Sequence, residues 1–114
     1  NDGDPPFSQF ADFPKAIQGT EGMFRILLSH NPTHWRREVL PDSDIELTLS
    51  GHTHAMQMEM LGHSLASLIY PEWSGMYYDG KRALYVKVGI GYVGLPFRFG
   101  AWPEITVIKL VCEN

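Results

Sequence analysis

The sequence predicts an α/β fold, and three observations support this class. Two short apolar runs, residues 24–29 and 45–49, have the length of buried strands, and each ends in small polar residues. The segment between them is about as long as a short crossover helix, which a pair of parallel strands requires. A hairpin pattern follows, in which Asp79-Gly80 separates two β-prone runs.

The bulk properties indicate a single globular domain, residues 1–114. A hydrophobic share of 44% with 12% aromatic residues excludes a disordered chain. The net charge of −4 and the lack of a basic stripe argue against a nucleic-acid partner. No apolar run reaches the ~18 residues that a membrane helix needs, so we expect no membrane span and a soluble chain. The single cysteine, Cys112, excludes an internal disulfide and a zinc site built on several cysteines.

Residues 1–22 are predicted to form an irregular N-terminal arm. This stretch mixes Asp, Pro, Ser and Phe without a helix or strand period, although residues 15–20 are compatible with a helical turn that ends at Gly19. Gly3-Asp4 follows no strand and runs into Pro5-Pro6, so we interpret it as linker.

The first predicted strand, residues 24–29, ends in Ser29-His30 and is stopped by Pro32. A helix is expected over residues 33–40, because Thr33 has N-cap chemistry and a proline closes the segment. His34 lies four residues beyond His30. Two interpretations stay open for His34. It either supports a binding site by contacting its ligand residues or a substrate, or it caps the helix or packs in the core.

The second predicted strand, residues 45–49, ends in a Ser50-Gly51 turn, and His52 and His54 follow. Parallel strands joined by a helix place their carboxyl ends side by side, so His30 is expected in one crevice with this pair. Neutral imidazole is the commonest metal ligand near neutral pH, and the pattern therefore indicates a metal site. The alternative is a surface loop whose histidines bind nothing.

Beyond the histidines, residues 70–75 form an aromatic loop that either rims a site or packs as an ordinary loop. The run Gly89–Gly94 formally fits a dinucleotide-binding fingerprint, but Pro96 follows where that motif must open a helix. We therefore interpret its glycines as a turn with close backbone approach. Residues 104–111 are predicted to form the last strand.

These histidine motifs resemble the C-terminal half of calcineurin-like metallophosphoesterases. The matching residues are Leu27-Leu28-Ser29-His30-Asn31-Pro32 and Leu49-Ser50-Gly51-His52-Thr53-His54. The tail from Val88 to Thr106 resembles one bacterial branch, whose members are often membrane-linked phosphohydrolases. The resemblance covers residues 24–110. It implies two mixed sheets that face each other between helices, with the histidine strands in one sheet and the hairpin and last strand in the other.

The resemblance also implies residue roles and cofactors. His30 and His52 would ligate one metal ion, and His54 would reach a second. Two divalent transition metals, Mn, Fe or Zn, would serve the complete enzyme. Gln57 would hydrogen-bond a ligand histidine. The glycine loop, including Gly91, would lie near the metals. Arg98, the one basic residue there, would be either a phosphate contact or a structural ion-pair partner.

The family's first-half motifs, an Asp-x-His strand end, a Gly-Asp bridge and a Gly-Asn-His-Asp/Glu segment, have no counterpart here. We therefore expect a C-terminal portion of a larger phosphoesterase domain, inactive alone and with no catalytic residue of its own. The expected substrate is a phosphorylated small molecule or a lipid-linked phosphoester, and membrane association is implied for the longer protein only. Two other functions stay open: a binding module with vestigial histidines, and a mononuclear zinc hydrolase with a three-histidine site. The oligomeric state is not indicated.

Overall fold

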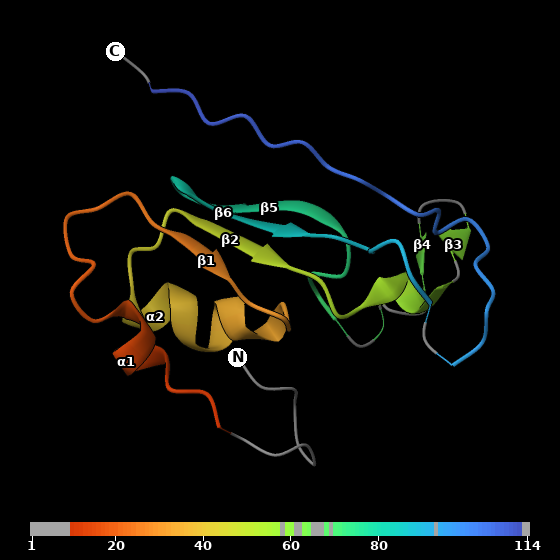
Figure 1. Cartoon of the computed structure of the whole chain (residues 1–114), viewed down its shortest axis with the longest axis horizontal. Coiled ribbons are helices and arrows are strands. Elements are labelled where there is room, and N and C mark those ends of the chain that lie inside the picture. Colours follow the sequence, from red (N-terminus) through yellow and green to blue (C-terminus); the bar gives the residue numbers. More distant parts are fainter. Residues whose placement is uncertain are drawn as a thin grey trace.

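A computed structural model describes residues 10–57, 59–60, 63–64, 68, 70–92 and 94–112. Its centre is a mixed sheet of four strands in the order β1-β2-β6-β5, which confirms the α/β class (Figure 1). The strands are β1 Ile26–Leu28, β2 Leu47–Ser50, β5 Gly75–Asp79 and β6 Arg82–Val86, with a separate pair formed by β3 Glu59–Met60 and β4 His63–Ser64. The helices are α1 Phe13–Ile17, the π-helix η1 Trp35–Val39, α2 Leu40–Asp42 and the 3₁₀ segment η2 His54–Gln57.

The parallel unit predicted from the sequence is present, but the placement of the hairpin was wrong. β1 and β2 are parallel neighbours with Leu27 opposite Thr48, and the chain between them is helical. β6 adds to β2 as a third parallel strand, with Thr48 opposite Leu84. β5 then pairs antiparallel with β6 across a turn at Gly80, whose φ is +59°. The hairpin therefore extends the histidine-bearing sheet, because β2 offers β6 a free edge there.

One face of the sheet is packed by the helices. Figure 1 shows α1 and α2 together on this side. Side chains from the helices and from alternate sheet positions share one hydrophobic core, since successive strand residues point to opposite faces. The buried members of this core are Phe13, Trp35, Val39, Ile45, Leu84 and Val86.

On the opposite face of the sheet, the two edge strands are exposed in the described part of the chain. Ile26 and Leu28 of β1 are exposed there, as are Met76 and Tyr78 of β5. We call these four side chains the open apolar face. They alternate along their strands with residues that face the helices, so all four point to the side of the sheet away from the helices.

The predicted last strand was wrong, because residues 101–112 belong to no strand of the described sheet. β6 already has β2 and β5 as neighbours, so this segment finds no free edge beside it. It is held instead by Tyr85, whose hydroxyl lies 2.6 Å from Thr106 Oγ1 and also donates to the Glu104 carboxylate. Burial, followed by the bond to Glu104, raises the pKa of Tyr85.

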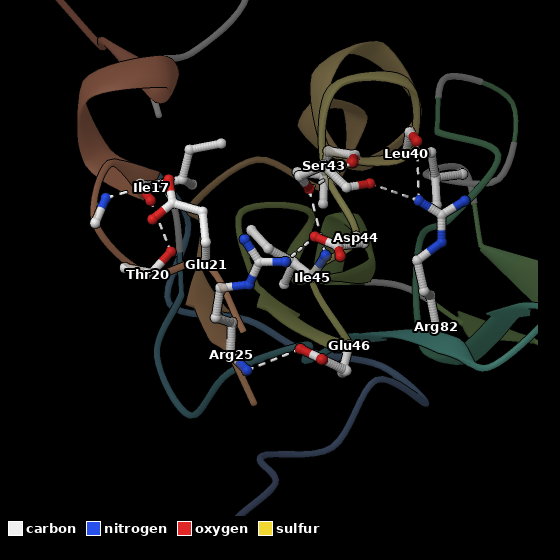
Figure 2. A network of polar contacts seen from close by, with 12 residues as sticks. Ile17, Thr20, Glu21, Arg25, Leu40, Ser43, Asp44, Ile45, Glu46 and Arg82 are labelled. Carbon is white, nitrogen blue, oxygen red and sulfur yellow. Dashed lines mark hydrogen bonds and ion pairs between the residues drawn. The ribbon is translucent and has the colours of Figure 1, made fainter. Parts of the chain in front are cut away.

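Two arginines connect the helical crossover to the sheet, as Figure 2 shows. Arg82 Nη1 donates to the carbonyls of Leu40 at 2.8 Å and Ser43 at 2.9 Å. Arg25 pairs with Asp44, and its backbone N–H donates to Glu46 Oε2 at 2.8 Å. These bonds fix where the crossover leaves α2 and enters β2.

The N-terminal arm predicted over residues 1–22 contains helix α1. Asp12 caps this helix by accepting from the Lys15 N–H at 3.1 Å, and Phe13 is buried in the core. The cap and the buried aromatic explain why an otherwise aperiodic stretch becomes helical. Residues 1–9, with the Gly3-Asp4 linker, lie outside the described residues. Within the described ranges, no helix has the length and apolarity that a membrane crossing requires.

Candidate metal centre

Backbone hydrogen bonds align the carboxyl ends of β1 and β2, where the predicted histidines stand. The Ser29 N–H donates to Leu49 O at 2.9 Å, and the Gly51 N–H donates to His30 O at 3.2 Å. The residue after each strand is thereby held next to its neighbour. This is why side chains far apart in sequence, His30 and His52, reach the same place.

The rings of His30 and His52 are in direct contact. Nδ1 of His52 lies 2.8 Å from Nε2 of His30, and the ring centroids are 4.6 Å apart at an interplanar angle of 71°. Nε2 of His52 lies 3.1 Å from the Tyr70 hydroxyl. Both nitrogens of His52 are therefore engaged, and Tyr70 helps to set the orientation of its ring.

The donor atoms of this pair suit a transition metal after a small movement. Zinc–nitrogen bonds of about 2.0–2.1 Å with tetrahedral angles place two ligand nitrogens roughly 3.3 Å apart. The observed 2.8 Å is a hydrogen-bond distance, so one ring carries a proton between the two nitrogens. A shift of that proton to the other nitrogen of its ring and a separation of about half an ångström would convert the contact into a two-imidazole metal site.

His54 lies against the loop that follows β6. Its Nδ1 is 3.4 Å from Arg98 Nη2, and a Cβ built on Gly89 would meet its ring at 3.6 Å. Burial, the charge of Arg98 and the charge of His30 all lower the pKa of His54. The described residues contain no group of three His, Cys, Asp or Glu able to hold one ion. The structure thus brings His30 and His52 together and keeps His54 apart, which does not favour a single three-histidine zinc site.

The turn that carries these histidines has a left-handed backbone. His52 has a φ of +67°, and the four residues of η2 have φ values between +44° and +60°. L-residues in this region cost roughly 1–2 kcal/mol each, and they persist where surrounding contacts fix them. The contacts here include Thr53 Oγ1, which donates to Trp73 O at 2.7 Å, and the Phe99 N–H, which donates to Gln57 O at 2.8 Å.

A crevice of about 240 Å³ opens at this turn, lined by His52, Thr53, His54, Met56 and Gln57. Gln57, predicted to support a ligand histidine, is buried and donates from Nε2 to Leu95 O at 3.3 Å. It connects the histidine turn to the loop that follows the glycines.

Arg98 and Gly91 are joined to each other. Arg98 Nε donates to Gly91 O at 2.7 Å, and its terminal nitrogens donate to Ala101 O at 2.7 Å and Val88 O at 2.8 Å. The sequence left Arg98 as a phosphate contact or an ion-pair partner. The guanidinium is instead occupied by backbone carbonyls, an arrangement that residue type and spacing do not reveal.

His34 lies in the core beneath the turn. It is 3% exposed, its Nδ1 is 2.9 Å from Ser29 Oγ, and its ring meets Phe13 edge-on at 4.9 Å. Burial lowers its pKa, although the Glu38 carboxylate opposes this shift. This position agrees with the interpretation of His34 as a packed histidine.

Two polar contacts of the aromatic loop were missed by sequence reasoning. Tyr70 was placed only within a loop that could rim a site, and no local signal indicated its contact with His52. Glu72 is buried and pairs with Arg36 of η1, whose own side chain stays 63% exposed. A buried carboxylate requires a partner, but the sequence does not say which arginine provides it.

The chain is similar to several known proteins over most of its length. It is 42% identical over 102 residues to a zebrafish (Danio rerio) transmembrane protein with metallophosphoesterase domain, a match that covers 87% of this chain and 23% of the relative. It is 37% identical over 100 residues to the uncharacterized metallophosphoesterase YkuE of Bacillus subtilis, covering 83% of this chain and 34% of the relative. It is 34% identical over 91 residues to the phosphodiesterase YaeI of Escherichia coli, covering 76% of this chain and 32% of the relative.

In these three comparisons the chain spans between 23% and 34% of the relative's length. No family model matches the chain, and no solved structure matches it. The matches nevertheless cover 76–87% of this chain and agree with the α/β fold. The chain belongs to the calcineurin-like metallophosphoesterase family.

Proposed function

We propose that the chain is the C-terminal portion of a metal-dependent phosphoester hydrolase. In this proposal His30 and His52 hold one metal ion, and His54 reaches a second ion. The observation that carries it is the contact of His30 with His52, because two neighbouring parallel strands deliver them to one point. A pair of divalent ions, Mn, Fe or Zn, would polarise the phosphoryl group and supply an activated water.

The residues of this chain would orient the site. The β1–β2 backbone bonds keep His30 and His52 adjacent, and Tyr70 fixes the outer nitrogen of His52. Thr53 and Gln57 brace the strained turn. Rigid ligands of this kind lose little freedom when an ion binds, which favours binding.

We further propose that the remainder of the phosphoesterase domain covers the open apolar face. Two observations support this: Ile26 and Leu28 on one edge strand and Met76 and Tyr78 on the other are exposed on the same face, and the matched relatives are several times longer than this chain. Carboxylate ligands would also come from that remainder. The isolated chain would then bind metal weakly and would lack turnover.

A phosphodiester is the substrate class that we propose, small or lipid-linked, because the Escherichia coli relative is named a phosphodiesterase. The crevice beside His52 and His54, of about 240 Å³, leaves room for a phosphoryl group and part of its substituent.

Zinc titration of the isolated chain tests the assignment, with the histidine ring signals followed by NMR. Zinc should shift His30 and His52 together at the lowest concentrations, and His52→Ala should remove that binding. His54→Ala is the matched control and should leave it in place. Equal losses in both variants would indicate one three-histidine site and overturn the two-ion assignment.

An activity measurement tests the second part of the proposal. The chain, equilibrated with Mn²⁺ or Zn²⁺, is assayed with a chromogenic phosphodiester, and no turnover is expected. Metal-dependent turnover that disappears in His52→Ala would show that the described residues suffice and would contradict the need for further ligands.

A further inference from the structure

Arg98 occupies a central position between three parts of the chain around His54. Its side chain donates to the carbonyls of Val88, Gly91 and Ala101 at 2.7–2.8 Å. A guanidinium has five N–H donors in a rigid planar fork. Three of them are used on backbone carbonyls, and a fourth approaches Nδ1 of His54 at 3.4 Å. Little of its donor capacity is left for a substrate.

One nitrogen of Arg98 connects the glycine loop to the His54 ring. Nη2 donates to Val88 O at 2.8 Å and also faces His54 Nδ1 at 3.4 Å. The next residue, Gly89, packs on the same ring, since a Cβ at this position would lie 3.6 Å from both Cε1 and Nδ1. The loop and the ring are therefore held against each other with Arg98 between them.

Below this contact lies a small hydrophobic cluster of Ala55, Val88 and Ala101, with Trp73 beside it. Ala55 follows His54 directly, and Val88 and Ala101 provide two of the carbonyls that Arg98 binds. The packing and the hydrogen bonds thus act on the same residues. Arg98 therefore links the backbone of Val88 to that of Ala101, and the third member of the cluster, Ala55, is next to His54.

We infer that Arg98 is a positioning residue, which holds the Val88–Gly91 loop against His54 and fixes the orientation of that ring. Arginine can only donate, so Nδ1 of His54 is the acceptor and Nε2, on the far side of the ring, faces away from Arg98. This inference rests on the proposed function, because it explains how His54, the proposed ligand of the second ion, is oriented. It adds a third role to the two that the sequence left open for Arg98, a phosphate contact and a structural ion-pair partner.

The geometry requires a guanidinium and not merely a positive charge. Lysine would keep a charge beside His54, but its single ammonium cannot reach three carbonyls that lie in different directions. Arg98→Lys therefore separates the electrostatic role from the positioning role. Arg82→Lys is the matched control, because Arg82 also donates to two backbone carbonyls, Leu40 and Ser43, far from the histidines.

The test is a nuclear Overhauser measurement on the labelled chain without metal or substrate. In the unsubstituted chain, a Gly89 α-proton should show a contact with the Hε1 proton of His54. Arg82→Lys should keep this contact even if it lowers the unfolding midpoint. Arg98→Lys should lose the contact while the remaining amide spectrum stays folded.

Two outcomes would overturn the inference. The first is absence of the Gly89–His54 contact in the unsubstituted chain, which needs no variant to fold. The second is an unchanged contact in Arg98→Lys, which would mean that the guanidinium fork does not hold the loop. Because no metal is present, either failure leaves the phosphoesterase proposal standing, and a failed zinc titration at His30 and His52 leaves this inference standing.

Discussion

The two faces of the sheet provide a matched test of the fold. Leu84 in β6 is 0% exposed and packs under the helices, whereas Leu28 in β1 is 75% exposed on the open apolar face. The same substitution, leucine to alanine, can therefore be made on both faces of one sheet. The difference between the two variants measures how much each face is covered in solution.

The expected magnitudes follow from burial. Leu84→Ala removes a fully buried side chain and leaves a cavity, and should lower the free energy of unfolding by about 3 kcal/mol. Leu28 has only a quarter of its surface covered, so Leu28→Ala should cost less than about 1 kcal/mol. With a denaturant slope of about 1.5 kcal/mol per molar urea, Leu84→Ala should lower the unfolding midpoint by about 2 M.

The assay is urea unfolding followed by tryptophan fluorescence, since Trp35 lies in the same core as Leu84. If Leu84→Ala is too unstable to measure, Ile45→Val samples this core with an expected cost of about 1 kcal/mol. A Leu28→Ala variant as costly as Leu84→Ala would refute the reasoning. It would show that the open apolar face is covered in the isolated chain, and the dependence of the midpoint on protein concentration would then identify self-association.

Three further outcomes follow from the structure. Met56 has a φ of +44°, so Met56→Gly should stabilise the chain by about 0.5–1 kcal/mol. Met76 in β5 is equally exposed, and Met76→Gly should destabilise the chain. If Met56→Gly destabilised the chain and Met76→Gly stabilised it, the left-handed turn would be contradicted. Burial lowers the pKa of His34 in the folded chain, so on acidification His34 is protonated in the unfolded chain before it is protonated in the folded one. The free energy of unfolding should therefore fall as the pH decreases below about 6.5. Urea titrations should show a shallower loss for His34→Gln, and an unchanged pH dependence would count against a buried neutral ring. Tyr85→Phe removes the bond to Thr106, so amide exchange should rise over the C-terminal segment but not in β2; equal protection in both proteins would mean that other contacts hold the segment.

The sequence was sufficient for the features that depend on local signals. Apolar runs located β1 and β2, the Asp79-Gly80 turn located the hairpin, and the histidine motifs predicted the family that the similar proteins confirm. The assignment of His30, His52 and His54 as metal ligands stays a prediction, although the first two are in contact.

Features decided by tertiary partners were not predictable in this way. The hairpin joined the histidine sheet because β2 had a free edge, and residues 104–111 form no strand although β1 and β5 are the edge strands of the described sheet. The left-handed conformation of the η2 turn contradicts the preferences of its residues, so only the contacts around it explain it. Likewise, the acceptors of Arg98 are backbone carbonyls, which every residue has and no sequence pattern marks.

The strand order of the sheet has a consequence for the order of folding. β5 and β6 are joined by a tight turn and can pair within microseconds, whereas the pairing of β6 with β2 closes a long loop and is entropically costly. The histidine turn lies inside that loop, so its strained conformation can be fixed only after β2 and β6 have met. We expect amides of the hairpin to gain protection early in refolding and those of residues 51–57 to gain it last. The chemically important turn would then be the final part of the chain to acquire its native shape.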